Sequence, residues 1–452
     1  MTSGNNPVVS VIVPARNEEN CLAFCLESLV SQAGIEFEII VVDDASTDRT
    51  AEIATSFSTN RVGAALQASP KSLDCGGAGV PARHQLTVLT APPLPENWTG
   101  KNNAMSAGAK IANTNAKWLL FTDADTVHKP GSLARAVAEA ERYGAALLSY
   151  SPEQEVHSFW EKAVMPVIFA ELAATYPPKK VNDPASAIAA ANGQYLLISR
   201  EAYDAVGGHT KIASDLLEDV AMARLVKSSG RQIFFRYGGD AVRTRMYRSW
   251  AQMKEGWTKN VALLFYPASS IACLRLSEIV FVAVTLAQSA SLLTLKIGGF
   301  RGFASMPLGG CLMPALLAMF TWIIVLIRIR KAHFPLSSSL LSIFGLPVFA
   351  YLLLESAKLR NLGNIGWRGR QYKSTMRATP RWFVTQGGLF LIAALLCAVL
   401  FGAMLVVVAL PPNLFHASKI LSEPQPPAPQ TQRARRFDPD TLVGDALSHP
   451  QS

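Results

Sequence analysis

Two short apolar runs that end in acidic residues constrain the fold of this chain more than any other feature. Asp43 and Asp44 follow the run EIIVV, and Asp123 and Asp125 follow the run KWLLFT. Such runs are typical of buried strands in a parallel sheet. The sequence therefore predicts carboxylates at the carboxyl ends of two strands, which is the edge where open α/β sheets bind ligands.

The first 265 residues alternate between strand-like and helix-like patterns and predict one catalytic domain. Alternation of this kind indicates a mainly parallel α/β sheet covered by helices. Residues 58–84 are rich in Gly, Ala, Ser and Pro and predict a long loop. We expect strands at Val8–Val13, Phe37–Val42, Leu86–Leu89, Trp118–Thr122 and Leu147–Tyr150.

Residues 271–410 change character and predict an all-α transmembrane region with three or four hydrophobic segments. Apolar stretches close to the length of a bilayer span follow one another with basic flanks. Residues 411–452 are rich in proline and predict a disordered tail. The four stretches are Ile279–Leu295, Leu308–Ile327, Leu336–Leu354 and Leu389–Leu410.

The charge of the chain is divided between its two halves. Residues 1–270 contain 25 basic and 27 acidic residues, whereas residues 271–452 contain 17 basic and 6 acidic residues. Because the basic half is also the apolar half, its charge favours a bilayer surface as partner and argues against nucleic acid. The six cysteines have no zinc spacing, and we see no signal peptide. We therefore expect a multi-pass protein of the inner (cytoplasmic) membrane whose catalytic domain faces the cytosol.

The basic residues of the membrane half do not fit four full spans. Residues 328–331 and 358–381 are both basic, and both belong on the cytosolic side. Leu336–Leu354 separates them and contains Gly345 and Pro347. We therefore expect either Leu336–Leu354 or Ile279–Leu295 to be re-entrant or interfacial.

Asp123 and Asp125 form a DxD arrangement at a strand end. Two carboxylates in this position can share a hard cation with a sugar nucleotide, and Mg²⁺ or Mn²⁺ prefers such oxygen ligands. We expect the metal to contact Asp125 and to offset charge on a leaving diphosphate. The alternative is a solvated surface turn.

Asp43, Asp44 and Lys101 are candidates for substrate binding. A carboxylate after the second strand can accept hydrogen bonds from a base or ribose, or it can cap the next helix. Lys101 follows Gly100 at the predicted start of a helix, where free N–H groups and a positive charge suit a diphosphate. A lysine on the surface is the alternative interpretation.

Glu218 and Asp219 form a third acidic pair, at the start of an apolar helix. A glycosyl acceptor hydroxyl needs a base, for which Asp219 is our candidate, with Glu218 orienting it. Capping of the helix is the alternative. Arg245, Arg248 and Trp250 suit a diphosphate and a sugar face, or anchor the chain beside the membrane.

Together these residues resemble family 2 glycosyltransferases with the type A nucleotide-sugar fold. The segment VIVPARNEE at residues 11–19 is similar to the opening strand and turn of that family. The segments LPENWTGK at 94–101 and WRGRQY at 367–372 resemble the hopene-associated branch, which is related to ceramide glucosyltransferases. The family's Gln/Arg-x-x-Arg-Trp element corresponds here to Arg245–Trp250, with one residue inserted before the tryptophan.

The resemblance implies an inverting transfer from a nucleotide-sugar donor, UDP-linked, to a membrane lipid acceptor such as a hopanoid, a ceramide-like lipid or a diglyceride. It implies that Asp44 contacts the nucleotide, Asp123 the ribose and Asp125 the metal, and that Asp219 is the base. The alternatives are transfer to a polyprenyl phosphate, which needs no base, and a non-catalytic membrane scaffold.

Overall fold

We describe a computed structural model of the chain. It describes residues 7–58, 85–300, 302–361, 364–367 and 370–373. Residues 59–84 of the loop predicted at 58–84, the fourth apolar stretch and the proline-rich tail lie outside these residues, and Ser58 ends a helix.

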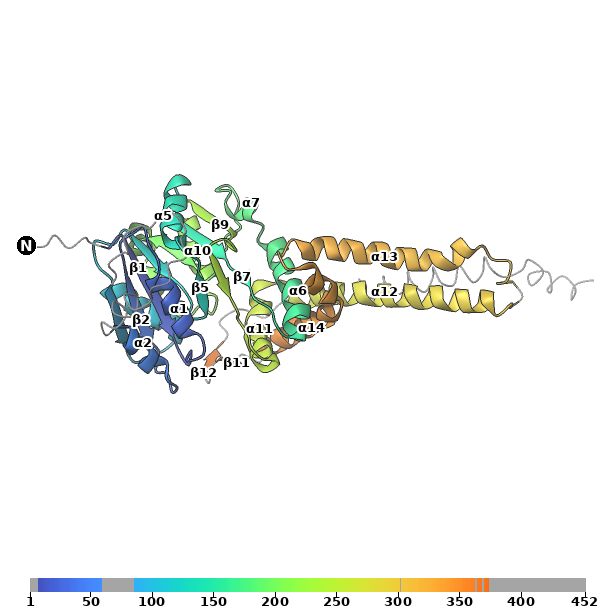
Figure 1. The fold of residues 1–452 in the computed structure, drawn as a ribbon, viewed down its shortest axis with the longest axis horizontal. Helices are drawn as coiled ribbons and strands as arrows, with labels where there is room; N and C mark the ends of the chain where they lie inside the picture. The colour runs from blue at the N-terminus through green and yellow to red at the C-terminus, as the bar shows by residue number, and fades with distance from the viewer. Residues whose placement is uncertain (1–6, 59–84, 301, 362–363, 368–369, 374–452) are drawn as a thin grey trace, which may run out of the picture.

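The catalytic half is built on a seven-stranded, mainly parallel sheet (Figure 1). Four parallel strands occupy one side of it, in the order β3-β2-β1-β4, and β8 is antiparallel to its neighbours β4 and β6. This arrangement confirms the predicted α/β fold. The strands are β1 (Val9–Ala15), β2 (Phe37–Asp43), β3 (Gln85–Thr90), β4 (Trp118–Phe121), β6 (Leu147–Ser151), β8 (Leu196–Ser199) and β9 (Ile233–Tyr237).

A second, three-stranded sheet supports the turn after β4. It has the order β5-β10-β7 and consists of β5 (Thr126–His128), β7 (Glu153–Gln154) and β10 (Val242–Thr244). The hydroxyl of Thr244 donates to the carbonyl oxygen of Asp125 at 3.1 Å. The small sheet therefore fixes the backbone of the DxD segment.

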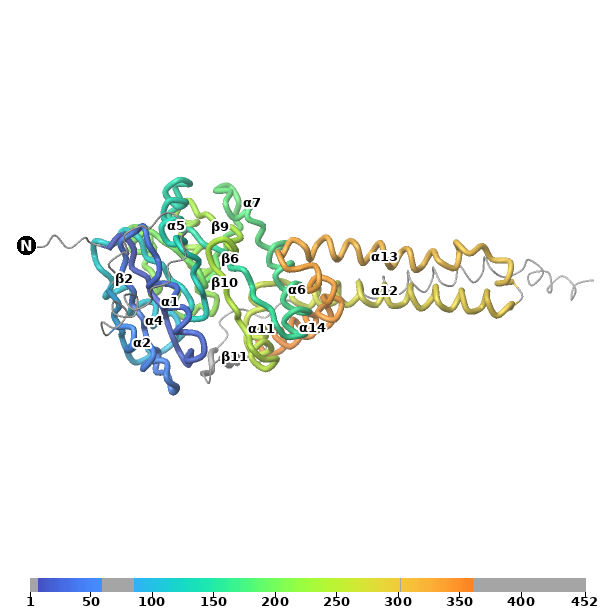
Figure 2. The backbone as a smooth tube through the Cα atoms, in the orientation of Figure 1, coloured from blue at the N-terminus to red at the C-terminus, as the bar shows by residue number. Residues whose placement is uncertain are grey.

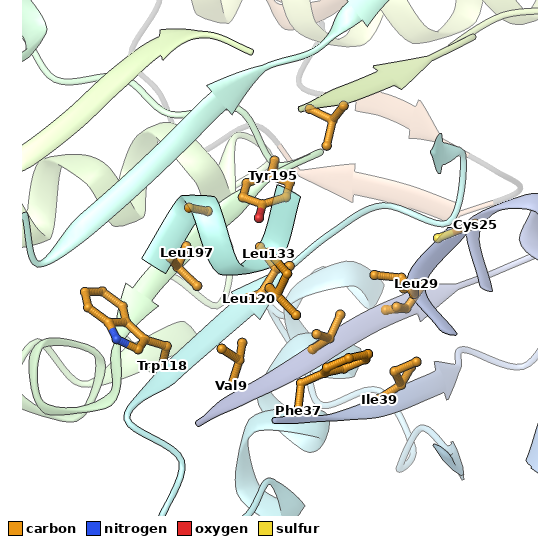
Figure 3. Packing of buried hydrophobic residues seen from close by; sticks show 14 of the residues in the cluster. Val9, Cys25, Leu29, Phe37, Ile39, Trp118, Leu120, Leu133, Tyr195 and Leu197 are labelled. Carbon is orange, nitrogen blue, oxygen red and sulfur yellow. The ribbon is translucent and has the colours of Figure 1, made fainter. Parts of the chain in front are cut away.

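Helices cover both faces of the large sheet and bury two apolar clusters. On one face, α1 and α5 pack on the sheet, with Leu29, Phe37, Leu120 and Leu133 among the buried residues (Figure 3). On the other face, α4, α8 and α10 pack over Ile12 and Ile40. The helices of this half are α1 (Leu22–Val30), α2 (Thr50–Ser58), α4 (Gly100–Ile111), α5 (Ser132–Arg142), α6 (Phe159–Thr175), α7 (Pro178–Val181), α8 (Arg200–Ala205), α9 (Gly208–Lys211), α10 (Glu218–Ser228) and α11 (Trp250–Leu264).

Three further helices are long and apolar enough to cross a membrane: α12 (Ala268–Ile297), α13 (Leu308–Arg330) and α14 (Leu336–Asn361). The backbone trace shows α12 and α13 side by side, extending away from the sheet as a long hairpin (Figure 2). By contrast, α14 lies at the base of this hairpin and packs on α6 and α11. After it, β11 (Asn364–Trp367) pairs with β12 (Arg370–Lys373) in an antiparallel hairpin.

Candidate active site

A cavity of about 610 Å³ opens at the carboxyl edge of the large sheet. The turns after β1, β2 and β4 contribute to its wall, together with the N-termini of α4 and α10. The predicted edge of the sheet is therefore hollow and polar. Six of the candidate residues from the sequence line it: Asp44, Lys101, Asp123, Asp125, Glu218 and Asp219.

Lys101 lies between the two groups of acids. Thr99 caps α4 by accepting a hydrogen bond from the Asn102 N–H at 3.1 Å, which places Lys101 in the first turn. The Lys101 Nζ lies 2.6 Å from Asp123 Oδ1 and 2.7 Å from Glu218 Oε1. Burial opposes the charge of Lys101, but these two carboxylates outweigh it and hold the Lys101 pKa above its ordinary value.

Glu218 and Asp219 are adjacent but differ in acidity. Asp219 accepts hydrogen bonds from the N–H groups of Val220 at 2.7 Å and Gly193 at 2.9 Å. Burial, reinforced by the charge of Glu218, nevertheless raises the pKa of Asp219 to about 6. Burial also opposes ionisation of Glu218, but Lys101 outweighs it and lowers the Glu218 pKa. Asp219 is therefore suited to accept a proton near neutral pH, while Glu218 stays charged.

The close approach of the loop around Gly193 depends on its missing side chain. A Cβ at this position would lie 3.1 Å from both the Lys101 Nζ and the Glu218 Oε1. Such contacts are tighter than nearly all real Cβ contacts. Glycine thus lets the Gly193 N–H reach the Asp219 carboxylate without displacing the ion pair.

The Asp43–Asp44 pair is divided between the turn and the cavity. Asp44 is buried, and its N–H donates to the carbonyl oxygen of Ala15 at 2.8 Å. Arg16 donates to the carbonyl oxygen of Asp44 at 2.5 Å, so the turns after β1 and β2 are tied together. Asp43 is absent from the lining within the described residues, and its Oδ1 accepts from the Ser46 N–H at 3.3 Å. Asp44 therefore lines the cavity, whereas Asp43 shapes the turn.

The two DxD carboxylates offer oxygen ligands to the cavity. In the part of the chain that the structure describes, no group of three or more His, Cys, Asp or Glu residues is placed to hold a metal ion. A divalent ion beside Asp125 would therefore need substrate phosphates and water as further ligands. Mg²⁺ is commonly bound in this way, by one or two carboxylates plus phosphates, so the residues present fit such an ion.

Arg245, Arg248 and Trp250 have contacts elsewhere. The Arg245 Nη2 lies 3.1 Å from Glu161 Oε1, and the Arg248 N–H donates to Gln252 at 2.9 Å. The ring of Trp250 lies 5.5 Å from that of Trp160. Among the described residues, these three predicted substrate contacts do not line the cavity, although Met246 and Tyr247 between them do.

Part of the cavity lining, here called the apolar arm, is apolar and comes from α6, α11 and the segment just before α14. Sequence reasoning did not identify it. The available signal was the sequence of α6, in which only Glu161, Lys162 and Glu171 interrupt an apolar run of 17 residues. The arm is lined by Phe169, Leu172, Tyr176, Trp257, Leu264 and Phe334.

Lys259 is another cationic residue that lines the cavity, and the sequence did not reveal it. It projects from α11 and lines the cavity with Asn260. Burial lowers the pKa of Lys259 to about 8, and the charge of Glu218 opposes this effect. Lys259 therefore remains mostly protonated at pH 7. The helix also contains Gln252, Lys254, Glu255 and Thr258, so nothing in its sequence singled out Lys259.

The mainly parallel sheet, with its acidic cluster at the carboxyl edge and its apolar helices behind, defines the type A fold of nucleotide-sugar-dependent glycosyltransferases. The family model for glycosyl transferase family 2 matches residues 10–78 and 93–207. The catalytic half of this chain is similar to that family over these residues.

The chain is similar to curated and solved glycosyltransferases. It is 27% identical over 266 residues to 4,4'-diaponeurosporenoate glycosyltransferase of Staphylococcus aureus strain USA300, covering 57% of this chain and 62% of that relative. The mannosyltransferase PcManGT from Pyrobaculum calidifontis, in complex with GDP-Man and Mn²⁺, is 15% identical with a TM-score of 0.41 and coverages of 79% and 87%. S. aureus TarS 1–349 in complex with UDP-GlcNAc is 12% identical with a TM-score of 0.32 and coverages of 82% and 98%.

Proposed function

We propose that this protein transfers a sugar from a nucleotide-sugar, UDP-linked, to a membrane lipid, with inversion at the anomeric carbon. One observation carries the proposal: a single cavity joins the acidic edge of the sheet to an apolar arm beside the membrane helices. The polar end suits the donor, and the apolar end suits a lipid chain. The protein would be a multi-pass protein of the cytoplasmic membrane, with the catalytic domain in the cytosol.

We assign to the residues the roles that the family resemblance implies, and their places in the cavity support these roles. Asp44 would bind the nucleotide and Asp123 the ribose, with Lys101 beside Asp123 to attract the diphosphate. Asp125 would hold Mg²⁺ or Mn²⁺, which supplies positive charge against the leaving diphosphate. Asp219 would take the proton of the acceptor hydroxyl as that oxygen attacks the anomeric carbon from the opposite face.

Membranes that contain the protein test this proposal directly. They would be given radiolabelled UDP- and GDP-sugars one at a time, with Mn²⁺ or Mg²⁺ present or chelated. We expect label in the organic-extractable lipid from wild type with metal, and a loss of that label in Asp125→Asn. Metal-independent transfer by Asp125→Asn at the wild-type rate would contradict the assigned role. If no donor gave lipid label, the non-catalytic alternative would be favoured.

A second acceptor class, a lipid carboxylic acid, is favoured by Lys259. A protonated lysine in the cavity can hold a carboxylate, and the S. aureus relative takes its name from a carboxylate, diaponeurosporenoate. An acceptor that is already an anion needs no base, as also holds for a polyprenyl phosphate. The product would then be a glycosyl ester, which mild alkali cleaves, whereas a glycoside resists it. Activity that survives Asp219→Asn, with an alkali-labile product, would establish this acceptor class.

A further inference from the structure

The middle of α14 lies directly against the catalytic half. A Cβ at Gly345 would overlap the carbonyl group of Ala163 in α6, so the two helix backbones are in direct contact there. The adjacent Phe344 ring lies 5.7 Å from the ring of Phe159, at the start of α6. A helix crossing the bilayer would instead have its midpoint in the hydrocarbon, far from a domain in water.

Both ends of α14 also lie on the catalytic side. Just before the helix, the His333 ring stacks on Tyr237, the last residue of β9, with centroids 4.1 Å apart. Near its end, Arg360 Nη1 donates to the carbonyl oxygen of Ala262 in α11 at 2.8 Å. The hairpin strand β11 that follows contacts α11 as well.

These anchors are incompatible with a crossing. A helix of this length extends about 39 Å at 1.5 Å per residue. Crossing would separate its ends by the roughly 30 Å of the hydrocarbon core. In the structure, α14 instead runs antiparallel to α6 and stays in contact with it. Phe334, just before α14, lies by Phe169, and Gly345 lies by Ala163, which is earlier in α6.

One face of α14 is nevertheless apolar and exposed. Its exposed side chains recur every three or four residues, which places them on one stripe. The opposite face is buried against the protein and includes Ser338, Ser339, Ser342 and Ser356. The apolar residues of the stripe are Leu336, Leu340, Phe344, Pro347, Tyr351 and Leu354.

Exposed aromatic rings from the catalytic half extend this stripe. Phe159, Trp160 and Trp250 are 47%, 42% and 38% exposed. The ring centroid of Trp160 lies 5.0 Å from that of Phe159 and 5.5 Å from that of Trp250. Lys254 lies 5.4 Å from the ring of Tyr351. Tryptophan and tyrosine with nearby cations are typical of the boundary between lipid headgroups and acyl chains.

We propose that α14 does not cross the bilayer but lies in its surface, with the stripe and these aromatic rings inserted among the lipid headgroups on the catalytic side. Among the described helices, α12 and α13 are then the pair that crosses. Arg328, Arg330 and Lys331 then lie on the same side as Lys358 and Arg360, as the charge pattern of the sequence requires. The inference rests on the proposed membrane location but not on the donor or the acceptor.

Accessibility of single cysteines to a membrane-impermeant maleimide tests the topology. In a background without native cysteines that keeps the wild-type melting temperature, the sites are Lys331→Cys before α14, Lys358→Cys near its end and Ile297→Cys at the tip of α12. Asp204→Cys on the exposed face of α8 marks the catalytic side. We expect Lys331→Cys and Lys358→Cys to react only in the vesicle orientation in which Asp204→Cys reacts, and Ile297→Cys only in the other.

Two outcomes would overturn the proposal. Reaction of Lys331→Cys and Lys358→Cys in opposite orientations would show that α14 crosses. Reaction of Ile297→Cys together with Asp204→Cys would show that the α12–α13 hairpin does not cross, which would also remove the proposed membrane anchor. Neither result involves activity, so failure of the proposed reaction is recognised separately, in the sugar-transfer assay.

The depth of the stripe is a second readout. A nitroxide on Phe344→Cys is compared with one on Phe320→Cys, an exposed position within α13. Collision with oxygen and with a water-soluble nickel complex is measured for each label in the same vesicles. We expect the label on Phe344→Cys to lie less deep in the bilayer than the label on Phe320→Cys. It should also collide less with the nickel complex than a label on Asp204→Cys. Equal depth at Phe344→Cys and Phe320→Cys would contradict an interfacial helix.

Discussion

Two neighbouring carboxyl groups in the cavity differ in pKa, and this difference is what the proposed chemistry requires. Glu218 is held ionised by Lys101, while burial and the charge of Glu218 raise the pKa of Asp219 to about 6. The choice of Asp219 as the base is supported by that separation of pKa values.

Asp219→Asn should reduce sugar transfer to a lipid hydroxyl by about 10²–10⁴-fold, because the amide cannot accept the proton. In the wild-type protein the base is active when deprotonated, so kcat/KM should fall as the pH drops below about 6. Asp204→Asn, on the exposed face of α8, is the matched control and should leave the rate unchanged. If Asp219→Asn kept the wild-type rate, or if kcat/KM of the wild-type protein did not fall below about pH 6, Asp219 would not be the base.

Two substitutions that remove a charge beside Asp219 should move the pH at which kcat/KM falls in opposite directions. Glu218→Gln removes the negative charge that raises the pKa of Asp219, so the inflection should move to lower pH. Lys101→Met removes a positive charge that lowers it, so the inflection should move to higher pH. The pH dependence of kcat/KM for both variants checks the signs. Shifts in the same direction would show that Asp219 is not the titrating group.

The sequence predicted which acids lie at the cavity better than it predicted the contacts of each residue. Asp44, Asp123, Asp125 and Asp219 all line the cavity, because the carboxyl ends of strands converge at one edge. Whether Asp43 or Asp44 reaches the cavity depends on the local turn, and the partner of Arg245, Glu161, lies 84 positions away. Neither could be derived from spacing along the chain.

At the scale of elements, the contact of α4 with the sheet sets the position of Lys101. Gly108 in α4 lies so close to β1 that a Cβ there would be 2.6 Å from the Ile12 Cγ2 and 3.1 Å from the Val42 Cγ2. The first turn of α4, which carries Lys101, is therefore positioned by the packing of its later turns.

Gly108→Ala should lower the free energy of unfolding by about 1–3 kcal/mol, because two strand side chains must move. Gly309→Ala is a matched control in another helix, where a Cβ meets nothing within 4 Å. It should be neutral or slightly stabilising, since alanine favours the helix. Thermal unfolding in detergent measures both. A more stable Gly108→Ala variant would contradict the close packing.

The strands of the parallel side of the large sheet were predicted, whereas most of the other strands were not. β1 to β4 and β6 correspond to the five predicted strands. β8 and β9 were not predicted, although β4 and β6 have the same lengths of four and five residues. β5, β7 and β10 have only two or three residues, which is too few for a periodic pattern to stand out. Their pairing arises from tertiary contacts that bring distant segments together.

At the scale of the whole molecule, an ionic network joins the catalytic half to the α12–α13 hairpin. The Arg275 Nε of α12 lies 3.0 Å from Glu171 Oε1 of α6, and both side chains are buried. Arg328 of α13 reaches Glu278 of α12 with a bidentate pair at 2.7 and 2.9 Å. The orientation of the hairpin on the catalytic domain therefore depends on paired charges. The sequence shows these charges but not their pairing.

Glu171→Gln should lower the thermal stability of the protein, because breaking a buried ion pair on one side costs about 3–5 kcal/mol. Replacement of both partners, as Glu171→Leu with Arg275→Leu, should recover much of that loss, since apolar pairs of similar volume substitute well. Melting curves in detergent compare the two. Equal losses in the single and double variants would show that the pair does not couple the two halves.

The central claim is that one cavity holds a sugar nucleotide at its acidic end and a lipid in its apolar arm. The most direct measurement compares wild type with Leu172→Trp, which adds bulk to the arm in α6, using purified protein in lipid nanodiscs and the donor found active. We expect Leu172→Trp to bind the nucleotide-sugar with the wild-type Kd but to lose transfer of labelled sugar to lipid. Undiminished lipid product from Leu172→Trp, or turnover into a water-soluble product alone, would contradict the account.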